Sequence, residues 1–340
     1  MKVMVTTVRG LEDVVAEELK NTIDLQKASY TRLSGKIFFE LEGTLDKVIT
    51  RCKKIIREVY TIERVILLVK ELNIIEIKHI KEHLRNLLKT FLTVKNFSAV
   101  RAEELNCSLT SLEIANLVGQ SLDLISLDDP DLIIRAICRD NIVYIGIDLT
   151  GFASLHRRFY RKYIHPSMLN PVIANAMLNL AGVKNGFTIL DPMCGSGTIL
   201  IECKLRFSNT KCLGFDINPS HLQGAYINSK LAGIRLELDV ADVCSLKNKL
   251  EPETVDAVLT NPPYGIREKP IGGDLENIYR CLFDLSLFVL KRSKRICLIT
   301  PRRALMRRIL KEYSNSLKLI KNIKVIEGGL ESYIYLLVKV

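Results

Sequence analysis

Five consecutive residues, Asn261-Pro262-Pro263-Tyr264-Gly265, combine groups that suit one kind of chemistry. They follow an apolar run, 255–260, that is typical of a buried strand in a parallel sheet. The prolines remove two backbone donors and fix φ, and Gly265 allows the turn behind the ring. We call 261–265 the ledge: it presents an amide oxygen, a carbonyl and an aromatic face, which suits a flat substrate with an exocyclic amine. The alternative is an ordinary proline-rich loop.

A second group of candidate residues follows an earlier strand, 188–191, which ends in Asp191. The next residues are Cys194-Gly195-Ser196-Gly197-Thr198. The glycines allow a tight turn and the close approach of a ligand. We expect Ser196 or Thr198 to cap the following helix, whose free N–H groups favour an anion such as a carboxylate.

Two further strand ends carry acidic residues. Asp216 lies nineteen residues after Gly197 and is placed to accept both hydroxyls of a ribose. Asp242 follows the third strand and can accept a hydrogen bond from an adenine amine. A dinucleotide site would need a third glycine at position 200, where this chain has leucine. The three acidic strand ends and the ledge therefore favour S-adenosylmethionine.

The elements that position these residues follow a strand–turn–helix repeat, which predicts an α/β doubly wound parallel sheet. An apolar helix over 172–180 precedes it, and 323–327 and 333–340 are expected to form an antiparallel pair at its edge. The predicted strands are 188–191, 212–216, 236–240, 255–260 and 295–300.

The first half of the chain shows a different, mixed pattern. It predicts strands over 2–7, 36–41, 97–101, 132–138 and 142–148, the last two joined by a turn at 139–141, and the segment 58–69 is β-rich. It also predicts a helix that begins at Gly10 and further helices over 44–52, 74–91 and 110–125. The last of these is expected to be capped by Thr110 or Ser111.

Composition and charge indicate a globular protein with a polyanionic partner. Of the 340 residues, 48% are hydrophobic and 26% charged, and the net charge of +11 favours nucleic acid. No apolar run reaches the ~20 residues that span a bilayer, and no signal-peptide core is present, so we expect a cytosolic protein. The abundance of Ile, Lys, Arg and Glu leans towards a thermophile.

The nine cysteines form no C-x-x-C pair, which argues against a zinc site. We expect Cys138, Cys212 and Cys297, which lie in apolar runs, to behave as small core residues. In a thermophile an intracellular disulfide is also compatible with this composition.

Basic residues interleaved with aromatic ones connect the two halves between Gly151 and His165. Such a segment can grip phosphates and stack on bases, or it can be a solvated linker. A helix expected to begin at Thr300-Pro301 carries four arginines on one side, either an RNA-facing stripe or a solvated face. Arg267, just past the ledge, is a candidate for a phosphate beside a flipped base.

Motifs in the first half resemble a THUMP domain, the RNA-binding module of several tRNA-modifying enzymes. They are Phe97-x-x-x-Arg101, Ser108-x-x-Ser111-x-Glu113-Ile114-Ala115-x-x-Val118-Gly119, Asp129-Pro130-Asp131 and Tyr144-Ile145-Gly146-Ile147-Asp148. The resemblance implies a THUMP domain over 58–150, preceded by a ferredoxin-like domain over 1–57. Many THUMP domains have a histidine where this chain has Asn106.

Residues 191–202 resemble the first motif of class I methyltransferases, and the ledge resembles their amino-methyltransferase motif. With Leu155-His156-Arg157-Arg158-x-x-Arg161 and His165-Pro166, the whole chain is similar to archaeal tRNA guanine-N2 methyltransferases. The nearest group modifies guanosine 6 of the acceptor stem; the group that modifies guanosine 10 commonly has Asp at the position of Asn261. The resemblance implies a linker over 151–168 and a methyltransferase domain over 169–340, with seven strands, mostly parallel and one antiparallel.

The resemblance and the residues together assign candidate roles. We expect a tRNA partner, no metal, no membrane and no obligatory protein partner, with the chain a monomer or homodimer. The candidate catalytic residues are Asn261, Pro262 and Tyr264. The candidate S-adenosylmethionine contacts are Asp191, Cys194, Gly195, Gly197, Thr198, Asp216, Ile217, Asp242, Val243 and Asn261. The candidate RNA contacts are Arg101, Asn106, Ser108, Arg157, Arg158, Arg161, Lys162, Arg267, Arg302 and Arg303.

Two kinds of alternative stay open. The ledge also suits adenine N6 in DNA or RNA, guanine N2 in ribosomal RNA, and a glutamine amide in release factors, although the RNA-binding first half disfavours a protein substrate. The other alternative is an RNA-binding protein with an inactive methyltransferase fold. That alternative predicts damaged cofactor motifs, whereas Asp191, Gly195, Gly197, Asp216 and Asn261 are all present.

Overall fold

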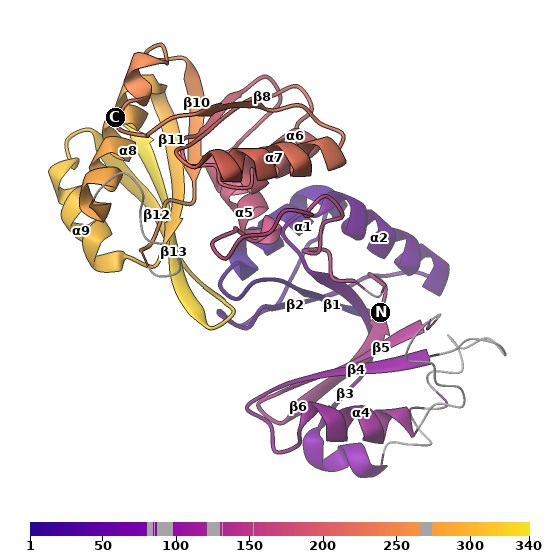
Figure 1. The fold of residues 1–340 in the computed structure, drawn as a ribbon. Coiled ribbons are helices and arrows are strands. Elements are labelled where there is room, and N and C mark those ends of the chain that lie inside the picture. Colours follow the sequence, from indigo (N-terminus) through magenta and orange to yellow (C-terminus); the bar gives the residue numbers. More distant parts are fainter. Residues whose placement is uncertain are drawn as a thin grey trace. The chain divides into compact units, whose positions relative to one another are not determined.

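The computed structural model describes residues 1–79, 84, 86, 98–120, 130, 132–151, 153–265 and 274–340. The chain forms two compact units (Figure 1). The first comprises Met1–Thr7, Ala16–Thr31 and Lys36–Leu155, and the second comprises Val8–Val15, Arg32–Gly35 and His156–Val340.

The first unit contains a six-stranded sheet in the order β2-β1-β3-β6-β5-β4, in which only β4 and β5 pair in parallel. Because β3 pairs with both β1 and β6, strands from the expected ferredoxin-like and THUMP segments share this sheet. The strands are β1 (Lys2–Thr6), β2 (Lys36–Glu40), β3 (Arg64–Asn73), β4 (Ser98–Leu105), β5 (Leu132–Arg139) and β6 (Ile142–Asp148). The helical elements are α1 (Glu12–Ile23), α2 (Leu45–Glu58), the 3₁₀ helix η1 (Ile74–His79) and α4 (Ser111–Gly119).

Helix α4 packs with η1 against the sheet, where Ile77, Ile114 and Val118 meet apolar side chains of β5 and β6. Thr110 caps α4 as predicted: its Oγ1 accepts from Glu113 N, and the Glu113 carboxylate accepts from Thr110 N. Thr44 stands at the N-cap of α2, which extends to Glu58 instead of ending at 52, but its side chain makes no capping bond. The remaining parts of the helices expected over 74–91 and 110–125, and Phe97, Asp129 and Asp131 of the THUMP-like motifs, lie outside the described residues.

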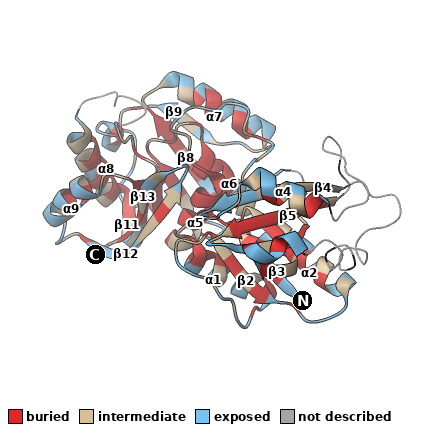
Figure 2. Cartoon of the chain, turned by 90° about the horizontal axis from the view of Figure 1, so that it is seen from below, coloured by how far each residue is buried: buried red, intermediate tan, exposed pale blue. Residues whose placement is uncertain are grey.

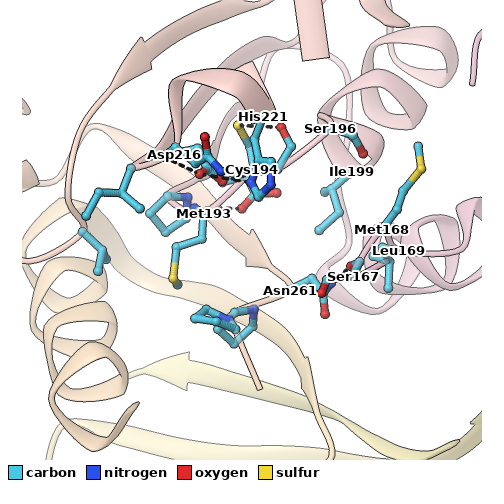
Figure 3. Close-up of a pocket in the computed structure, with 18 of the residues that line it drawn as sticks. Ser167, Met168, Leu169, Met193, Cys194, Ser196, Ile199, Asp216, His221 and Asn261 are labelled. Atoms are coloured by element: carbon cyan, nitrogen blue, oxygen red, sulfur yellow. Dashed lines mark hydrogen bonds and ion pairs between the residues drawn. The ribbon is translucent and has the colours of Figure 1, made fainter. Parts of the chain in front are cut away.

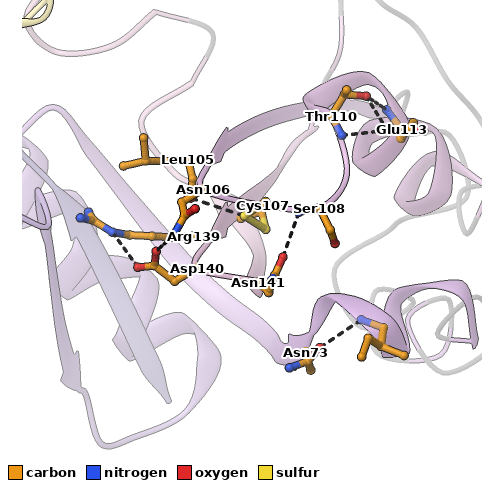
Figure 4. Close-up of a disulfide and its surroundings, with 12 residues drawn as sticks. Asn73, Leu105, Asn106, Cys107, Ser108, Thr110, Glu113, Arg139, Asp140 and Asn141 are labelled. Carbon is orange, nitrogen blue, oxygen red and sulfur yellow. Dashed lines mark hydrogen bonds and ion pairs between the residues drawn. A yellow bond between two sulfur atoms is a disulfide. The ribbon is translucent and has the colours of Figure 1, made fainter.

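The hairpin between β5 and β6 is confirmed, and its turn is tighter than expected. Asp140 and Asn141 alone make the turn, with φ of 49° and 61°, the left-handed conformation that two-residue hairpins require. A disulfide joins Cys107 to Cys138 on β5 beside this turn (Figure 4). Cys138 is buried as predicted, but the expectation that it is merely a small core residue was wrong.

A buried ion-pair network closes the first unit at the end of β6. Asp148, with a fully buried side chain, accepts from Arg64 at 2.7 Å and from Arg135 at 2.9 Å. Its other oxygen accepts from the Thr150 hydroxyl at 2.6 Å. Since removing one member of a buried ion pair leaves the other charge uncompensated, this network ties together three paired strands, β3, β5 and β6.

The second unit contains a seven-stranded sheet in the order β12-β13-β11-β10-β7-β8-β9. All pairs are parallel except those of β13, which is antiparallel to both neighbours. The predicted doubly wound sheet with seven strands, one of them antiparallel, is confirmed. The strands are β7 (Thr188–Asp191), β8 (Lys211–Asp216), β9 (Glu237–Val240), β10 (Val255–Thr260), β11 (Leu290–Thr300), β12 (Leu317–Glu327) and β13 (Leu330–Lys339).

Two apolar layers cover this sheet, and its central strands are buried (red in Figure 2). Alternate residues of each strand serve opposite layers: Ile189 and Ala257 face one core, and Leu190 and Val258 face the other. Helices α5, α6 and α7 contribute to the first core, and α8 and α9, with the 3₁₀ helix η2, contribute to the second. The bounds are α5 (Pro171–Ala181), α6 (Thr198–Arg206), α7 (Pro219–Leu231), η2 (Leu246–Asn248), α8 (Leu275–Val289) and α9 (Arg303–Glu312).

Several boundaries in the second unit differ from the prediction. Strands β12 and β13 begin at Leu317 and Leu330, six and three residues before their expected starts. Strand β11 begins at Leu290, five residues before the expected start, and runs through Thr300. Helix α9 therefore begins at Arg303 and not at Pro301, because Thr300 still belongs to the strand. In the described part of the chain, no helix is long and apolar enough to cross a membrane.

We predict that Asp148→Ala lowers the free energy of unfolding by about 3–5 kcal/mol, because it leaves Arg64 without its carboxylate and the buried Arg135 with only the exposed Glu103, 3.4 Å away. Glu71→Ala, which removes a pair with Lys2 that is 41–45% exposed, should cost less than ~1 kcal/mol. Urea denaturation measures both; equal small losses would show that the network is not a structural constraint.

Candidate active site

The carboxyl ends of β7, β8, β9 and β10 open onto one cavity, which we call the strand-end cavity. Figure 3 shows Asp216, Cys194 and His221 gathered at one end, and Asn261 with Ser167 at the other. Of the predicted residues, the cavity is lined by Asp191, Cys194, Gly195, Thr198, Asp216, Ile217, Asp242, Val243, Asn261, Pro262 and Tyr264. Three acidic side chains and the ledge, far apart in sequence, are therefore brought together as the strand pattern predicts.

The loop after β7 adopts the tight path expected of its glycines. Gly195 and Gly197 have φ of +52° and +78°, where a side chain is strained. Gly197 itself is the N-cap of α6, so the expectation that Ser196 or Thr198 caps this helix was wrong. With no side chain on its first free N–H groups, the helix N-terminus is available to an anionic ligand. Unlike its neighbours, Gly197 does not line the cavity.

Asp191 sits beneath this loop and is 1% exposed. Its Oδ1 accepts from Met193 N at 3.3 Å. Burial raises the pKa of Asp191 to about 7, partly opposed by hydrogen bonds. Burial also raises the pKa of the Cys194 thiol well above its ordinary value, so this cysteine is a neutral wall residue and not a nucleophile.

Asp216 ties the end of β8 to the loop after β7. Its Oδ2 accepts from Gly195 N at 2.8 Å and its Oδ1 from Asn218 N at 2.9 Å. A carboxylate has about four acceptor sites, so Oδ2 keeps capacity for a ligand hydroxyl, whereas Oδ1 also lies 3.5 Å from His221 Nδ1. Asp216 thus shapes the glycine loop as well as offering the predicted diol contact.

The loop after β9 carries Asp242 and Val243, and it is covalently anchored. Asp242 Oδ1 accepts from Cys244 N at 2.9 Å. Cys244 forms a disulfide with Cys281 of α8, the helix whose Ile278 also lines the cavity. A disulfide between these two walls was not predicted, because the cysteines are 37 residues apart and share no motif.

The ledge is held from three sides. Asn261 Nδ2 donates to Ser167 O at 3.1 Å, and Asn261 Oδ1 accepts from the Tyr264 hydroxyl. Arg302 Nε donates to Tyr264 O at 2.7 Å. Because the amide nitrogen is already bound to a carbonyl, the orientation of the Asn261 amide is fixed, and Oδ1 keeps one of its two lone pairs.

The segment 156–169, which we call the strap, supplies walls of the cavity that the sequence analysis did not assign. Arg158 and Tyr160 donate to the buried Glu202 of α6 at 2.9 and 2.6 Å, and Asn175 of α5 donates to it at 2.5 Å. These bonds place the strap beside α6. The strap residues in the wall are His165, Ser167, Met168 and Leu169, and Asn218 and His221, at the start of α7, also line the cavity.

The next turn of the strap is fixed by Asn228 of α7, whose side chain binds the backbone of Lys162 and Tyr163. A Cβ at Gly224 would lie 2.1 Å from the Tyr163 ring, so only glycine fits there. His165 then stacks on His221 with ring centroids 4.6 Å apart. The only sequence signal for this contact is the His165-Pro166 pair, a few residues before α5, within the expected linker 151–168.

The candidate RNA contacts are dispersed. Arg101 lies on β4, and Asn106 and Ser108 are exposed beside the Cys107 disulfide, with Asn106 Nδ2 donating to Asp140 Oδ1 at 2.7 Å (Figure 4). In the second unit Arg157 and Lys162 are exposed. Arg303 lies 5.2 Å from the Tyr333 ring. Arg267 lies outside the described residues.

Three of these arginines are engaged within the second unit. Arg158 is 17% exposed and paired with Glu202, and Arg302 supports the ledge. Arg161 is half-buried, and burial lowers the pKa of its guanidinium. Their side chains serve the strap and the ledge, a role that the basic–aromatic spacing did not reveal. Among the described residues no cluster could hold a metal ion.

We predict a pH-dependent stability from Asp191. Its folded pKa of about 7 exceeds its ordinary value of 3.8, so its contribution favours the folded state below pH ~4 and is lost as pH rises towards 7. Asp191→Asn, which does not ionise, should therefore match the parent near pH 4 and gain relative stability up to pH 8. The gain in the free energy of unfolding is at most roughly 4 kcal/mol, because each pH unit between the two pKa values contributes about 1.4 kcal/mol. Unfolding free energies at several pH values measure it; a difference that is constant with pH would contradict it.

Comparison with known proteins identifies the family. A family model described as RMKL-like, methyltransferase domain, matches residues 158–331. A tRNA (guanine(6)-N2)-methyltransferase of Archaeoglobus fulgidus is 27% identical, covering 87% of this chain and 82% of the relative. An enzyme of the same name from Methanocaldococcus jannaschii is 28% identical, and the match covers 99% of this chain and 100% of the relative. The crystal structure of TrmN from Thermus thermophilus matches with a TM-score of 0.80 and 25% identity, covering 100% of this chain and 99% of that one. The chain belongs to the RMKL-like methyltransferase family.

Proposed function

We propose that this chain transfers a methyl group from S-adenosylmethionine to the exocyclic N2 of a guanosine in tRNA, with guanosine 6 of the acceptor stem as its target. One observation carries the proposal: the ledge, which suits an exocyclic amine, borders the strand-end cavity. The two relatives that span most of the chain are both named tRNA (guanine(6)-N2)-methyltransferases.

The residues around the strand-end cavity fit S-adenosylmethionine. The free N-terminus of α6 and the loop at Gly195 suit its carboxylate, and Asp216 suits its ribose hydroxyls. Ile217 and Val243 offer apolar contact, and Asp242 an acceptor, for its adenine. When bound, the cofactor supplies an electrophilic methyl group on a sulfonium sulfur.

The ledge then has to position the acceptor amine and needs no strong base. A guanine amine is a poor nucleophile because its lone pair is delocalised into the ring. Asn261 Oδ1, through its remaining lone pair, and the Pro262 carbonyl oxygen can each accept a hydrogen bond from one N–H of the guanine amine. These two hydrogen bonds turn the lone pair of the amine nitrogen towards the methyl group. Tyr264 can stack on the base, and this stacking stabilises the bound base by roughly 1–3 kcal/mol. It offsets part of the free energy of taking the base out of the stem, which is a few kcal/mol. Positioning of this kind and preset dipoles supply the rate enhancement.

The first unit is proposed to hold the tRNA, as the THUMP resemblance of 58–150 implies. Arg101, Asn106 and Ser108 are its candidate contacts, and the exposed Arg157 and Lys162 are candidate contacts on the second unit. Because Arg158 is paired with Glu202, its proposed effect on RNA is indirect, through the strap. The reaction is placed in the cytoplasm, with tRNA as the partner.

The alternatives are separated by the product. Labelled methyl transfer to bulk tRNA tests whether the chain is an enzyme or an RNA-binding protein with an inactive fold. Digestion to nucleosides tells N2-methylguanosine from N6-methyladenosine. Mapping the modified nucleotide distinguishes guanosine 6 from guanosine 10, and the same assay on ribosomal RNA tests that substrate.

We predict that Asn261→Ala lowers methyl transfer at least 100-fold while leaving the affinity for S-adenosylmethionine within a few-fold. The amide acts on the acceptor amine, whereas most cofactor contacts come from the other strand ends. Single-turnover transfer and calorimetry measure the two effects. Parental activity in this variant would overturn the assignment of Asn261.

We predict that Asp216→Ala weakens cofactor binding at least tenfold, or about 1.4 kcal/mol. It removes the acceptor for the ribose and also the bond that shapes the loop at Gly195. Asp239→Ala is the matched control, because Asp239 lies on β9 outside the cavity, is 60% exposed and pairs with Lys249. Calorimetry should show the control unchanged; equal affinities in both variants would remove the role of Asp216.

A further inference from the structure

A second cavity lies on the other side of the ledge, against the β12–β13 hairpin, and we call it the hairpin cavity. Its volume of about 250 Å³ is several times the ~30 Å³ that a water molecule occupies in the liquid, so it is not a packing defect. It shares Asn261, Tyr264 and the end of the strap, Ser167 to Leu169, with the strand-end cavity. The two spaces are thus neighbours that meet at the residues proposed to hold the amine.

The walls of the hairpin cavity suit a flat, mostly apolar ring. Ile173, Ile299, Val325 and Leu330 supply apolar surface, and Tyr264 supplies an aromatic side chain. Methyl transfer requires the donor and the acceptor to lie on either side of the transferred carbon. If the strand-end cavity takes the methyl donor, as the proposed function states, the hairpin cavity is the place for the acceptor base.

Glu327 is the one charged side chain among the described residues that line this cavity. Its position at the end of β12 is set by Asn170, whose Nδ2 donates to Glu327 Oε1 at 2.7 Å. Asn170 is 7% exposed, and its Oδ1 caps α5 by accepting from Val172 N at 2.8 Å. Because the cap uses the oxygen, the amide nitrogen must face Glu327.

A carboxylate at this position distinguishes purines by the group at N1. Guanine carries an N1–H donor next to its 2-amine, whereas adenine presents a bare N1 acceptor there. Asn170 uses one of the roughly four acceptor sites of Glu327, and the rest can accept the N1–H in a charge-assisted bond. A bare N1 facing the carboxylate would meet a lone pair instead of a donor, and sites built for such a hydrogen bond reject analogues that lack it.

We propose that Glu327 accepts the N1–H of the target guanine and thereby selects guanine over purines with an unprotonated N1, such as adenine and 2-aminopurine, with Asn170 as its positioning residue. The proposal rests on the proposed function and adds to it a residue that reads the base. In this arrangement the ledge recognises the amine that is methylated, and the β12–β13 hairpin recognises the ring that carries it.

The test compares two tRNA transcripts, one with guanosine at the position that the parent methylates and one with 2-aminopurine there. 2-Aminopurine keeps the 2-amine but has an unprotonated N1. The parent should methylate guanosine at least ~100-fold faster than 2-aminopurine, within the range that a lost hydrogen bond produces. Glu327→Gln, which can donate to a bare N1, should slow guanosine methylation at least tenfold and reduce the preference to less than ~10-fold.

Two further variants control for structure. Glu331→Gln alters a carboxylate on the same hairpin that pairs with Lys324 and does not line the cavity, so it should keep the parental preference. Asn170→Ser keeps an oxygen that can cap α5 but cannot reach Glu327, so it should reduce the preference with an unchanged melting temperature.

The outcomes are distinct. A parental preference in Glu327→Gln, or equal loss on both transcripts, would overturn the role of Glu327 while leaving the proposed function intact. Absence of N2-methylguanosine from the parent reaction would instead overturn the proposed function, and with it this inference.

Discussion

The site depends on one buried carboxylate. Glu202 is 1% exposed, a position that an unpaired charge does not tolerate. Its partners come from the strap and from α5, and burial together with Glu202 raises the pKa of the Tyr160 hydroxyl well above its ordinary value, so the phenol stays a donor. Because the strap is held there, its later residues reach the ledge: Ser167 O accepts from Asn261, and His165 stacks on His221. A stretch with a basic, linker-like sequence is therefore part of the catalytic unit.

The ledge shows how little chemistry the protein itself has to provide. Its backbone is fixed by two prolines, by Arg302, and by Tyr279, whose hydroxyl contacts Thr300 at 2.7 Å and lies 3.5 Å from Pro263 O. These supports come from α8 and the end of β11, both anchored in the second core. Rigid groups of this kind need no reorganisation during the reaction, which is the advantage a weak nucleophile requires.

The architecture and the strand-end residues were predictable because they follow local rules. Apolar strands ending in Asp191, Asp216 and Asn261 imply a parallel sheet whose ends meet, and the sheet order follows from that pattern. The roles of Arg158 and Arg302 were not predictable. The sequence shows that these side chains are basic, but it does not show that each lies next to a hydrogen-bond acceptor in the folded chain. The same holds for Cys244 and Cys281, and for Glu327, whose partner Asn170 is 157 residues away. Contacts between distant segments arise only when the sheet is assembled.

The common wall of the two cavities has a thermodynamic consequence. Asn261, Tyr264 and the end of the strap belong to both spaces. A ligand that orders this wall from one side therefore reduces the conformational entropy that a ligand on the other side has to remove. The factor by which one ligand raises the affinity for the other equals the factor by which the second raises the affinity for the first. If the strand-end cavity binds the donor and the hairpin cavity the acceptor, as proposed, the two binding equilibria are linked by heterotropic cooperativity. The ledge is then a shared partition between two equilibria as well as the proposed place of methyl transfer.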